Sequence, residues 1–482
     1  MAYLMKRWSQ GGHPERSFSK REFDFTLRWN VAEAAARYRL SHGRLVKLRL
    51  CGKTTFATSE AKVIEHIMGP GARNYLLRPG QHWGLAAIGM LDRGIIWNQH
   101  LDSFRKNREC FQNALRSSEL TRGSSLARKA TCRWISTFSL QWEEVDMMDA
   151  MGELTVRTAL PLFFEIDADE LGTEELRELR NSIKGYFKAW EFFLLKPPIY
   201  RVFDFLRSLL GGPSRCKEAQ AKVRRVQMAI DRLLSRIPEE KWSSGIWLPS
   251  IRKMSHVDRR QMCIELLLAS ADTSSVTLYY TLVLLAQRKD LRQELVAEIE
   301  ASRAGKVIDE ASLRSLDKMD SALKESMRLK PVGPMILRTA IAEDAIPLES
   351  GELRVARGTH FILNIRDFHV DKEYFPSPSD VSPDRYKDPS QNRLFTPFGR
   401  GPKSCVGQHF AMLEMKAILC EVLQRLEFRT KQDLATMETR WDIANHPVAP
   451  EAFEVRQTEK FCQGRGEKFR LTSRSSGLPE EQ

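Results

Sequence analysis

Apolar residues recur at three- and four-residue spacing from about residue 61 to residue 329, which is typical of amphipathic helices. The clearest segments are Leu101–Leu115, Leu171–Phe193 and Ala219–Leu234. The longest helical pattern runs from about Val257 to Arg288 and is apolar on all sides in its middle. A helix with that pattern is buried on every face, so we expect it to cross the interior of the domain.

Short β-like runs flank the helical region. Leu45–Leu50 and Thr54–Ala57 predict a small hairpin. Leu353–Val355 and Phe361–Ile365 are two further runs, and the proline-rich stretch PSPSDVSPDRYKDPS follows them. The sequence therefore predicts a mainly α fold with a minor β component, in a single large domain.

Composition and charge narrow the class of protein. The 482 residues include 75 Lys and Arg against 62 Asp and Glu, a net charge of +13, and the balance of apolar and charged residues is that of a globular protein. The positive excess predicts acidic partners or a membrane surface, and no nucleic-acid partner, because the basic residues form no cluster. The eight cysteines are scattered without a C-x-x-C pair, which argues against a zinc ribbon and a disulfide scaffold.

The two ends are polar, and we expect residues 1–30 and 461–482 to be poorly ordered around a domain at 31–460. The most apolar region, Ile264–Ala286, is interrupted by Glu265 and Asp272, so the sequence as written predicts no spanning helix and no anchor. The segment Trp190–Leu210 is rich in Phe and Leu and contains three basic residues. Its pattern fits either a helix against a bilayer or a buried helix pair.

The most informative stretch is FTPFGRGPKSCVGQHFAMLEMKAIL, residues 395–419, where three glycines surround Cys405 and a helix then continues to about Leu426. A thiol in a glycine-rich loop at a helix N-terminus is stabilised as the thiolate. Such a thiolate can be a nucleophile or an axial ligand of haem iron. A nucleophile would need a partner such as His409, and a dinucleotide loop would need a preceding strand that the pattern lacks. A purely structural cysteine leaves the glycines around it unexplained.

The pattern F-G-x-G-x-x-x-C-x-G, from Phe398 to Gly407, resembles the haem-binding loop of the cytochrome P450 family. Glu325 and Arg328 match the E-x-x-R pair of that family and share a helix face. The loop P-D-R-Y supplies Arg385 as a third member of a buried structural network. The resemblance implies the P450 fold, a single large domain that encloses a haem.

The same resemblance implies a haem-thiolate monooxygenase with haem b as cofactor and Cys405 as the axial ligand of the iron. Asp272 would be the proton source in the long helix, and Thr273 would hydrogen-bond the bound oxygen. An acid beside a threonine in an apolar helix is costly unless it faces a polar cavity. Glu265 lies seven residues before Asp272, on nearly the same face, and we expect it to take part in catalysis.

Four segments resemble the aromatase branch of this family, which converts androgens to oestrogens: YFKAWEFFLLKPPIY, SADTSSVTLYYTLVLLAQ, LRPGQHWGLAAIGMLDRGIIWN and FGRGPKSCVGQHFAMLEMKAIL. This implies a steroid substrate, with Asp272 also enolising its 3-keto end, and NADPH-cytochrome P450 reductase as the electron donor. It further implies a peripheral position on the cytosolic face of the endoplasmic reticulum membrane. Two alternatives stay open: a P450 that hydroxylates another sterol or lipid, and a haem-bound steroid-binding protein with little activity.

The resemblance assigns roles residue by residue. The cofactor-binding positions, including those that pair with haem propionates, are Arg78, Arg108, Arg338, Phe398, Lys403 and Cys405. The positions that line the steroid cavity are Ile96, Trp97, Phe187, Trp190, Ala269, Asp272, Thr273, Val332, Leu337, Ile443 and Ala444. The basic positions on the proximal face, which would attract the reductase, are Arg105, Lys106, Arg400 and Lys403.

The sequence departs from the aromatase pattern at several of these positions. Phe104 stands where the pattern has a tryptophan that donates to a propionate, and Lys403 stands for an arginine. Ala271 replaces a proline that bends the long helix. The remaining changes lie near the cavity: Ser270 for Ala, Gly333-Pro334 for Val-Asp, and Ala444 for Ser. These changes alter the floor of the cavity and the helix, so they affect the substrate more than the haem.

Overall fold

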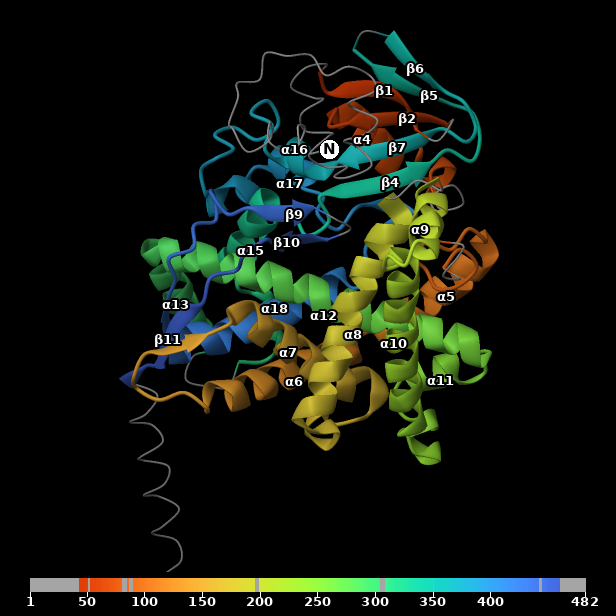
Figure 1. The fold of residues 1–482 in the computed structure, drawn as a ribbon. Helices are drawn as coiled ribbons and strands as arrows, with labels where there is room; N and C mark the ends of the chain where they lie inside the picture. Colours follow the sequence, from red (N-terminus) through yellow and green to blue (C-terminus); the bar gives the residue numbers. More distant parts are fainter. Residues whose placement is uncertain are drawn as a thin grey trace, which may run out of the picture.

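The apolar periodicity of the sequence becomes a block of packed helices in the computed structural model, which describes residues 43–50, 53–79, 85, 90–195, 199–303, 308–349, 351–441 and 444–459 (Figure 1). Residues 1–30 and 461–482 lie outside this part of the chain. The helices are α4 (Ala61–Met68), α5 (Leu101–Ala114), α6 (Ser117–Ile135), α7 (Met147–Ala159), α8 (Gly172–Leu195), α9 (Ile199–Leu209), α10 (Arg215–Ser235), α11 (Trp247–Arg252), α12 (His256–Gln287), α13 (Lys289–Arg303), α14 (Glu310–Arg314), α15 (Asp317–Leu329), α16 (Ile365–His369), α17 (Pro389–Leu394) and α18 (Gln408–Arg425). The mainly helical fold class predicted from the sequence is confirmed.

The long apolar pattern forms α12, whose 32 residues make a rod of about 48 Å. The side chain of Ser255 caps it by accepting the backbone N–H of Asp258 at 3.2 Å. Its middle is buried because α7, α10, α15 and α18 pack around it, except at Ala269, Ser270 and Thr273, which face an internal cavity. The prediction that this helix crosses the interior is confirmed, to within one residue at each end.

The strands are β1 (Leu45–Leu50), β2 (Lys53–Thr58), β3 (Glu143–Val145), β4 (Met335–Thr339), β5 (Asp344–Leu348), β6 (Gly351–Val355), β7 (His360–Asn364), β8 (Leu426–Arg429), β9 (Thr439–Trp441), β10 (Asn445–Pro447) and β11 (Phe453–Gln457). Within the described residues they form four small sheets, of which the two that contain β1, β2, β4, β5, β6 and β7 lie at one edge of the helical block, at the top of Figure 1. The largest sheet has the order β1-β2-β7-β4, with β2 and β7 parallel. The predicted hairpin is its β1–β2 pair.

The β4 strand brings the sheet to the centre of the molecule. Leu337 pairs with Ile362 and Arg338 with Phe361 of the central strand β7. A second apolar cluster, which includes Val63, Tyr75 and Phe361, fills the space between this sheet and α4. The sheet therefore fixes the position of β4, whose residues face the main core on one side.

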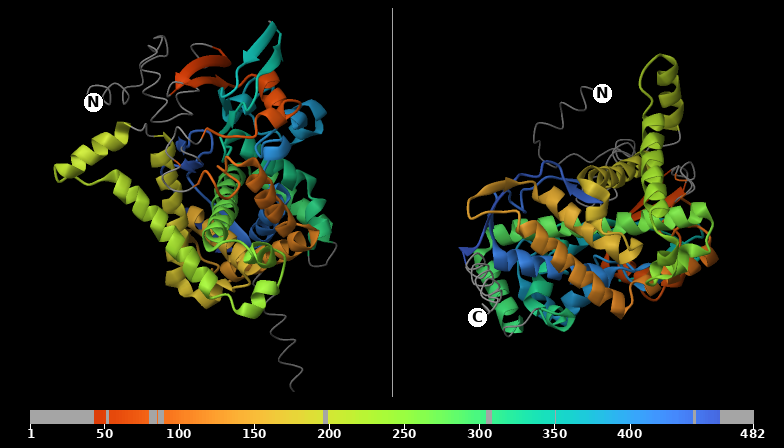
Figure 2. Two further views of the ribbon diagram at one scale, coloured as in Figure 1. Left: turned by 90° about the vertical axis from the view of Figure 1, so that its right-hand side faces the viewer. Right: turned by 90° about the horizontal axis from the view of Figure 1, so that it is seen from below.

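The helices α9 and α10 form a hairpin that projects from the body of the molecule (Figure 2). Asp204 on α9 is buried and holds the hairpin closed, since its carboxylate accepts the hydroxyl of Ser214 at 2.7 Å and the backbone N–H of Cys216 at 3.0 Å. The two ends of the predicted bilayer segment, Trp190–Leu210, differ in burial: Trp190 is buried in the interior, whereas the apolar side chains described on α9, from Phe203 to Leu209, are exposed.

Within the described residues, every helix is too short or too polar to cross a bilayer.

Candidate active site

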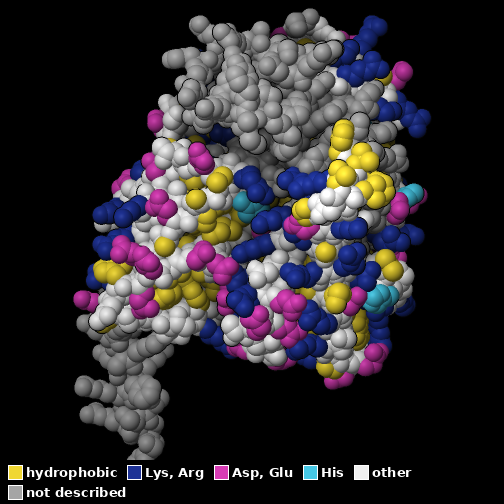
Figure 3. Space-filling model, viewed as in Figure 1, with side chains coloured by type: hydrophobic (Ala, Val, Ile, Leu, Met, Phe, Trp, Pro, Cys, Tyr) yellow, Lys and Arg dark blue, Asp and Glu magenta, His cyan; other side chains and the backbone are white. Residues whose placement is uncertain are grey.

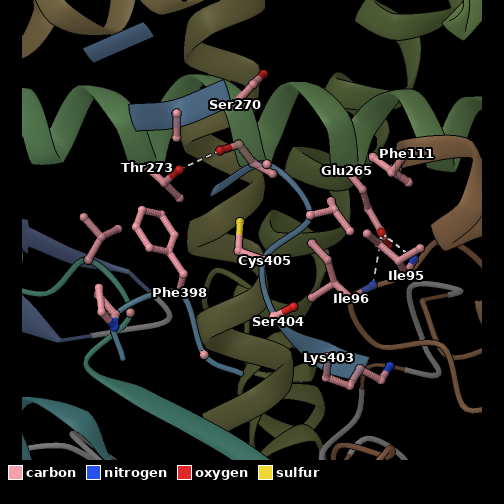
Figure 4. Close-up of a pocket in the computed structure, with 18 of the residues that line it drawn as sticks. Ile95, Ile96, Phe111, Glu265, Ser270, Thr273, Phe398, Lys403, Ser404 and Cys405 are labelled. Atoms are coloured by element: carbon pink, nitrogen blue, oxygen red, sulfur yellow. Dashed lines mark hydrogen bonds between the residues drawn. The ribbon is translucent and has the colours of Figure 1, made fainter. Parts of the chain in front are cut away.

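Cys405 lies in the loop that precedes α18. Its backbone N–H donates to the carbonyl oxygen of Phe398 at 2.8 Å, which closes the loop on itself. Gly399 and Gly401 have φ angles of +65° and +70°, where a residue with a Cβ is strained. A Cβ at Gly401 would also lie 2.8 Å from the carbonyl oxygen of Met68. The loop therefore needs its glycines, and it points the thiol into a cavity below α12 (Figure 4).

The cavity between the thiol and α12 has a volume of about 420 Å³ and a mostly apolar wall. Thr273 faces it from α12, and its hydroxyl donates to the carbonyl oxygen of Ala269 at 2.6 Å. The Cys405 thiol is open to the cavity although it lies deep inside the protein. Burial raises its pKa, whereas the N–H of Gly407 and the charge of Arg108 lower it.

The structure brings most of the predicted lining residues to this wall. These are Ile96, Trp97, Trp190, Ala269, Thr273, Val332 and Leu337. Phe187, Asp272 and Ala444 do not line the cavity, and Ile443 lies outside the described residues. Phe111, Phe163 and Phe410 also face the cavity, and none of them was predicted to line it, because apolar residues in or beside helices are usually part of the core.

Asp272 is turned toward β10. The imidazole Nε2 of His446 lies 2.9 Å from its carboxylate, and the ring of His446 packs on that of Phe187 with centroids 6.3 Å apart. Tyr280 holds the strand in place by donating to the carbonyl oxygen of Asn445 at 2.7 Å. His446 was not predicted from the sequence, where the one signal was a histidine two residues after the predicted lining residue Ala444.

Glu265 has different neighbours from Asp272. Its buried carboxylate accepts the backbone N–H groups of Ile95 at 2.7 Å and Ile96 at 3.1 Å, and the amide of Gln261 at 3.1 Å. Burial raises the pKa of Glu265, and these hydrogen bonds oppose the rise. Gly94 has φ +67°, and a Cβ there would collide with the carboxylate. The geometry thus makes Glu265 the anchor of the loop that carries Ile96 into the cavity.

Four basic side chains converge on the cavity: Arg78, Arg108, Arg338 and Lys403. Glu265 is the only acid among the described residues that line it. Burial and the neighbouring positive charges lower the pKa of Lys403 to about 6 and that of Arg338 well below its usual value. Buried charges of one sign are costly unless they are paired, so the cavity calls for an anionic ligand.

The position of Lys403 corrects one expectation. Its side chain is buried, and the ammonium nitrogen lies 3.4 Å from the centroid of the Phe104 ring, a cation–π contact. Lys403 therefore belongs to the cavity wall and does not offer its charge to a docking partner. Arg105 and Lys106 are exposed on α5, and Arg400 is half-buried in the cysteine loop.

Behind the cysteine loop lies a buried ionic network centred on Glu325. Its carboxylate accepts Arg328 at 2.7 and 2.9 Å, Arg385 at 3.3 Å and the hydroxyl of Tyr386 at 3.0 Å. Arg328 also donates to the carbonyl oxygen of Pro378 at 2.7 Å. The network joins α15 to the chain that leads into the cysteine loop, as the spacing of the motifs indicates.

Comparison with known proteins agrees with this geometry. The family model for cytochrome P450 matches residues 23–452. The chain belongs to the cytochrome P450 family. Curated relatives include the aromatases of Taeniopygia guttata, 28% identical over 435 residues (87% of this chain and 81% of the relative), and of Homo sapiens, 27% identical over 434 residues (86% and 82%).

A solved P450 has the same fold. The haem domain of a cytochrome P450DA mutant superposes with a TM-score of 0.73 at 16% identity, covering 89% of this chain and 94% of that one. The protein is thus a P450 monooxygenase, an enzyme that takes a lipophilic substrate and receives electrons from a redox partner.

The cofactor of this P450 is haem b, and the cavity residues fit it. The Cys405 thiol is a soft ligand suited to the iron. The excess of buried positive charge from Arg78, Arg108, Arg338 and Lys403 suits the two propionates, and the apolar walls suit the porphyrin.

The excess of basic residues in the cavity predicts two effects of removing one of them, on haem release and on the stability of the haem-free protein. Arg338→Met is expected to release haem about ten to a hundred times faster, because it removes a buried cation that would bind a propionate. The same change should raise the thermal stability of the haem-free protein, because one repelling charge is removed. Haem transfer to apomyoglobin and thermal denaturation measure the two effects. Arg354→Met, at an exposed site on β6, is the control; lower haem-free stability in Arg338→Met would contradict the charge argument.

The Glu325 network generates a prediction on stability. Glu325→Ala leaves two buried arginines without their carboxylate, and we expect a loss of about 3–5 kcal/mol in the free energy of unfolding. Urea denaturation of the haem-loaded protein, followed by absorbance of its reduced carbon-monoxide complex, measures this loss. Glu300→Ala on the exposed face of α13 is the matched control, and equal losses in both variants would refute a special role for Glu325.

Proposed function

We propose that this P450 oxidises a steroid, and that its specific reaction converts androgens to oestrogens. The observation that carries the proposal is the arrangement of Cys405 and Thr273 on opposite sides of an apolar cavity, with the acid Asp272 next to Thr273 in the same helix. The aromatases among the relatives, at 27–28% identity over most of the chain, support the steroid class. The electron donor in this proposal is NADPH-cytochrome P450 reductase.

The walls of the cavity suit a rigid, flat substrate. The rings of Trp97 and Trp190 pack edge to face with centroids 6.1 Å apart, and Ile96 and Leu337 add aliphatic surface. Glu265 keeps this shape by holding the backbone of the Ile96 loop. In this proposal it acts by positioning the wall. Apolar walls with few polar groups are typical of sites that bind steroid-like ligands.

Bound haem b supplies the activation of dioxygen and the insertion of one oxygen atom into a C–H bond. The chain's own part is to deliver protons at the right place. His446 is one-third exposed and lies 2.9 Å from Asp272, so a proton from solvent can pass through its imidazole to the carboxylate. The hydroxyl of Thr273 then orients a water in the cavity to receive it, by turning from the Ala269 carbonyl.

Arg105 and Lys106 are exposed on α5, which contacts the cysteine loop because Arg108 of that helix donates to the carbonyl oxygen of Ser404 at 2.9 Å, and Arg400 lies in the same loop. We assign Arg105, Lys106 and Arg400 to the docking surface for the acidic reductase, since complementary charge speeds association and orients the partner. Lys403 takes no part in this surface.

The proposal places the protein on the cytosolic face of the endoplasmic reticulum membrane, with α9 in the bilayer surface. Phe203, Phe205 and Leu209 on α9 are each more than 60% exposed, and Leu210 follows at 89%. Figure 3 shows apolar side chains gathered here with Lys and Arg side chains beside them. A projecting apolar helix flanked by basic groups suits an anionic membrane surface.

One observation favours a second candidate, the hydroxylation of another sterol or lipid without aromatisation. Asp272 is held by His446 outside the cavity lining, whereas enolising a 3-keto group requires its carboxylate to reach the substrate. In this candidate Asp272 only relays protons, and the substrate needs no keto group beside it.

Turnover of androstenedione with reductase and NADPH separates the two candidates. We expect a spin-state change on binding and oestrone as the main product by mass spectrometry. Hydroxylated androgens without oestrone would favour the second candidate, and the absence of both binding and turnover would remove the steroid proposal. Asp272→Asn should lower turnover about a hundredfold or more in either case, because the proton donor is lost.

The α9 proposal is tested by vesicle binding. Phe203→Ser, Phe205→Ser and Leu209→Ser combined are expected to lower binding to phosphatidylcholine–phosphatidylserine vesicles about a hundredfold, given the apolar area removed. Thermal stability should not change, because these side chains are already exposed. A control with Leu140→Ser and Val448→Ser removes exposed apolar groups elsewhere. Equal binding of the two variants in a sedimentation assay would place the contact on another face.

A further inference from the structure

Strand β10 carries His446, and helix α12 reaches this strand through two side chains that lie about two turns apart. The carboxylate of Asp272 lies 2.9 Å from the imidazole Nε2 of His446. Eight residues further on, Tyr280 donates its hydroxyl to the carbonyl oxygen of Asn445 at 2.7 Å. The proton route through His446 and Asp272 gives a function to the first contact and leaves the second without one.

Long side chains allow both contacts to fall on neighbouring residues of one strand. The rise along α12 between Asp272 and Tyr280 is about 12 Å, whereas adjacent residues of a strand are only about 3.4 Å apart. Side chains of an α-helix lean toward its N-terminus, so the phenol of Tyr280 reaches back toward the turn of Asp272. The phenol and the imidazole of His446 together bridge the difference.

The carbonyl group that Tyr280 holds belongs to the peptide unit that carries His446. Because a peptide unit is planar, the carbonyl group of Asn445 and the N–H and Cα of His446 move as one body. The N–H of Asn445 donates in turn to the carbonyl oxygen of Val332 at 2.9 Å. The backbone at Asn445 is thus held at its N–H and at its carbonyl oxygen, and this sets the direction in which the side chain of His446 leaves the strand.

The hydrogen bond from Tyr280 lies in the core, whereas His446 is one-third exposed. Tyr280 has no exposed surface, and burial raises the pKa of its hydroxyl, with the neighbouring Tyr279 and Asp272 acting in the same direction. The hydroxyl therefore keeps its proton and remains a donor. A buried carbonyl oxygen that loses its donor is costly, so the peptide unit would turn toward another partner and carry His446 with it.

We propose that Tyr280 is a positioning residue for proton delivery: its hydroxyl fixes the peptide unit of His446 so that the imidazole stays within hydrogen-bond reach of Asp272. Tyr280 itself neither carries the proton nor touches the cavity. The inference rests on the proton route of the proposed function, and it is independent of the steroid assignment.

The preceding residue offers a matched control. Tyr279 is also fully buried, and its ring centroid lies 6.0 Å from that of Tyr280. Its hydroxyl lies 3.5 Å from the side-chain oxygen of Gln432, away from the peptide unit of His446. Tyr279→Phe and Tyr280→Phe therefore remove the same group from adjacent core positions, and only the second should affect His446.

The first test reads the position of the His446 ring without any substrate. The protein is labelled with 15N-histidine and studied by NMR as its diamagnetic reduced carbon-monoxide complex, in which His446→Gln identifies the His446 signals. Tyr280→Phe is expected to move these signals from their wild-type positions, as Asp272→Asn does, because both changes break the contact between imidazole and carboxylate. Tyr279→Phe should leave them in place. Unmoved signals in Tyr280→Phe would overturn the proposal.

The second test separates positioning from a purely structural role. With androstenedione, Tyr280→Phe should lower kcat and the product formed per NADPH about tenfold, because a displaced donor transfers its proton slowly. KM and the spin-state titration should stay within about twofold of wild type, since Tyr280 does not line the cavity. A parallel change in KM, or a loss of folded, haem-loaded protein, would show a structural role and overturn the proposal.

A double variant tests whether Tyr280 acts through Asp272. In the Asp272→Asn background, Tyr280→Phe should cause no further loss of product per NADPH, because the contact that it positions is already broken. Losses that multiply in the double variant would overturn the proposal.

The NMR outcomes separate this inference from the proposed function. If wild-type enzyme does not turn over androstenedione, the steroid proposal fails, and the NMR measurement still decides the role of Tyr280. If the His446 signals do not move in Asp272→Asn, the proton route fails, and this inference with it. Signals that move in Asp272→Asn and stay in place in Tyr280→Phe refute the positioning role alone.

Discussion

One buried carboxylate, that of Glu325, holds the part of the molecule on which the cysteine loop rests. It accepts hydrogen bonds from two arginines, a tyrosine hydroxyl and the backbone N–H of Ser382, so all its lone pairs are used. The arginines in turn bind backbone carbonyl groups of the loop between α16 and α17. His369 extends this support, since its ring nitrogen accepts the N–H of Thr396 at 3.0 Å and its ring stacks on Phe395, just before the cysteine loop.

The basic residues of the cavity, in contrast to those of the Glu325 network, lack enough acidic partners in the described part of the folded chain. The Glu325 network is complete without any ligand, whereas Arg78, Arg338 and Lys403 are buried with too little negative charge to balance them. The Glu325 network therefore holds the chain beneath the thiol in place, whereas the basic residues beside the thiol repel one another. A dianionic cofactor relieves this repulsion, so part of the free energy of haem binding is stored in the folded chain itself.

The sequence was sufficient for the helices because their apolar spacing is long and regular, as in α12, and for the glycine-framed cysteine loop, because its backbone needs glycine at fixed positions. The sequence was less informative about side chains that have several possible hydrogen-bond partners. Two carboxylates seven residues apart share a helix face, yet Glu265 binds backbone N–H groups and Asp272 binds His446. Spacing along one helix cannot show which of these distant segments lies beside it.

Helix α12 also shows how this chain tolerates the loss of a helix-bending proline at Ala271. Its carbonyl oxygen accepts the hydroxyl of Thr155 from α7 at 2.8 Å, and the hydroxyls of Thr273 and Ser275 bind carbonyl oxygens of the same turns. Hydroxyl groups that compete for helix carbonyls bend a helix and weaken its own hydrogen bonds locally. At the turn that faces the thiol, several hydroxyl–carbonyl hydrogen bonds therefore stand in place of the single proline of the aromatase pattern. The helix stays continuous from His256 to Gln287, and this turn gains hydroxyl groups that a proline could not provide.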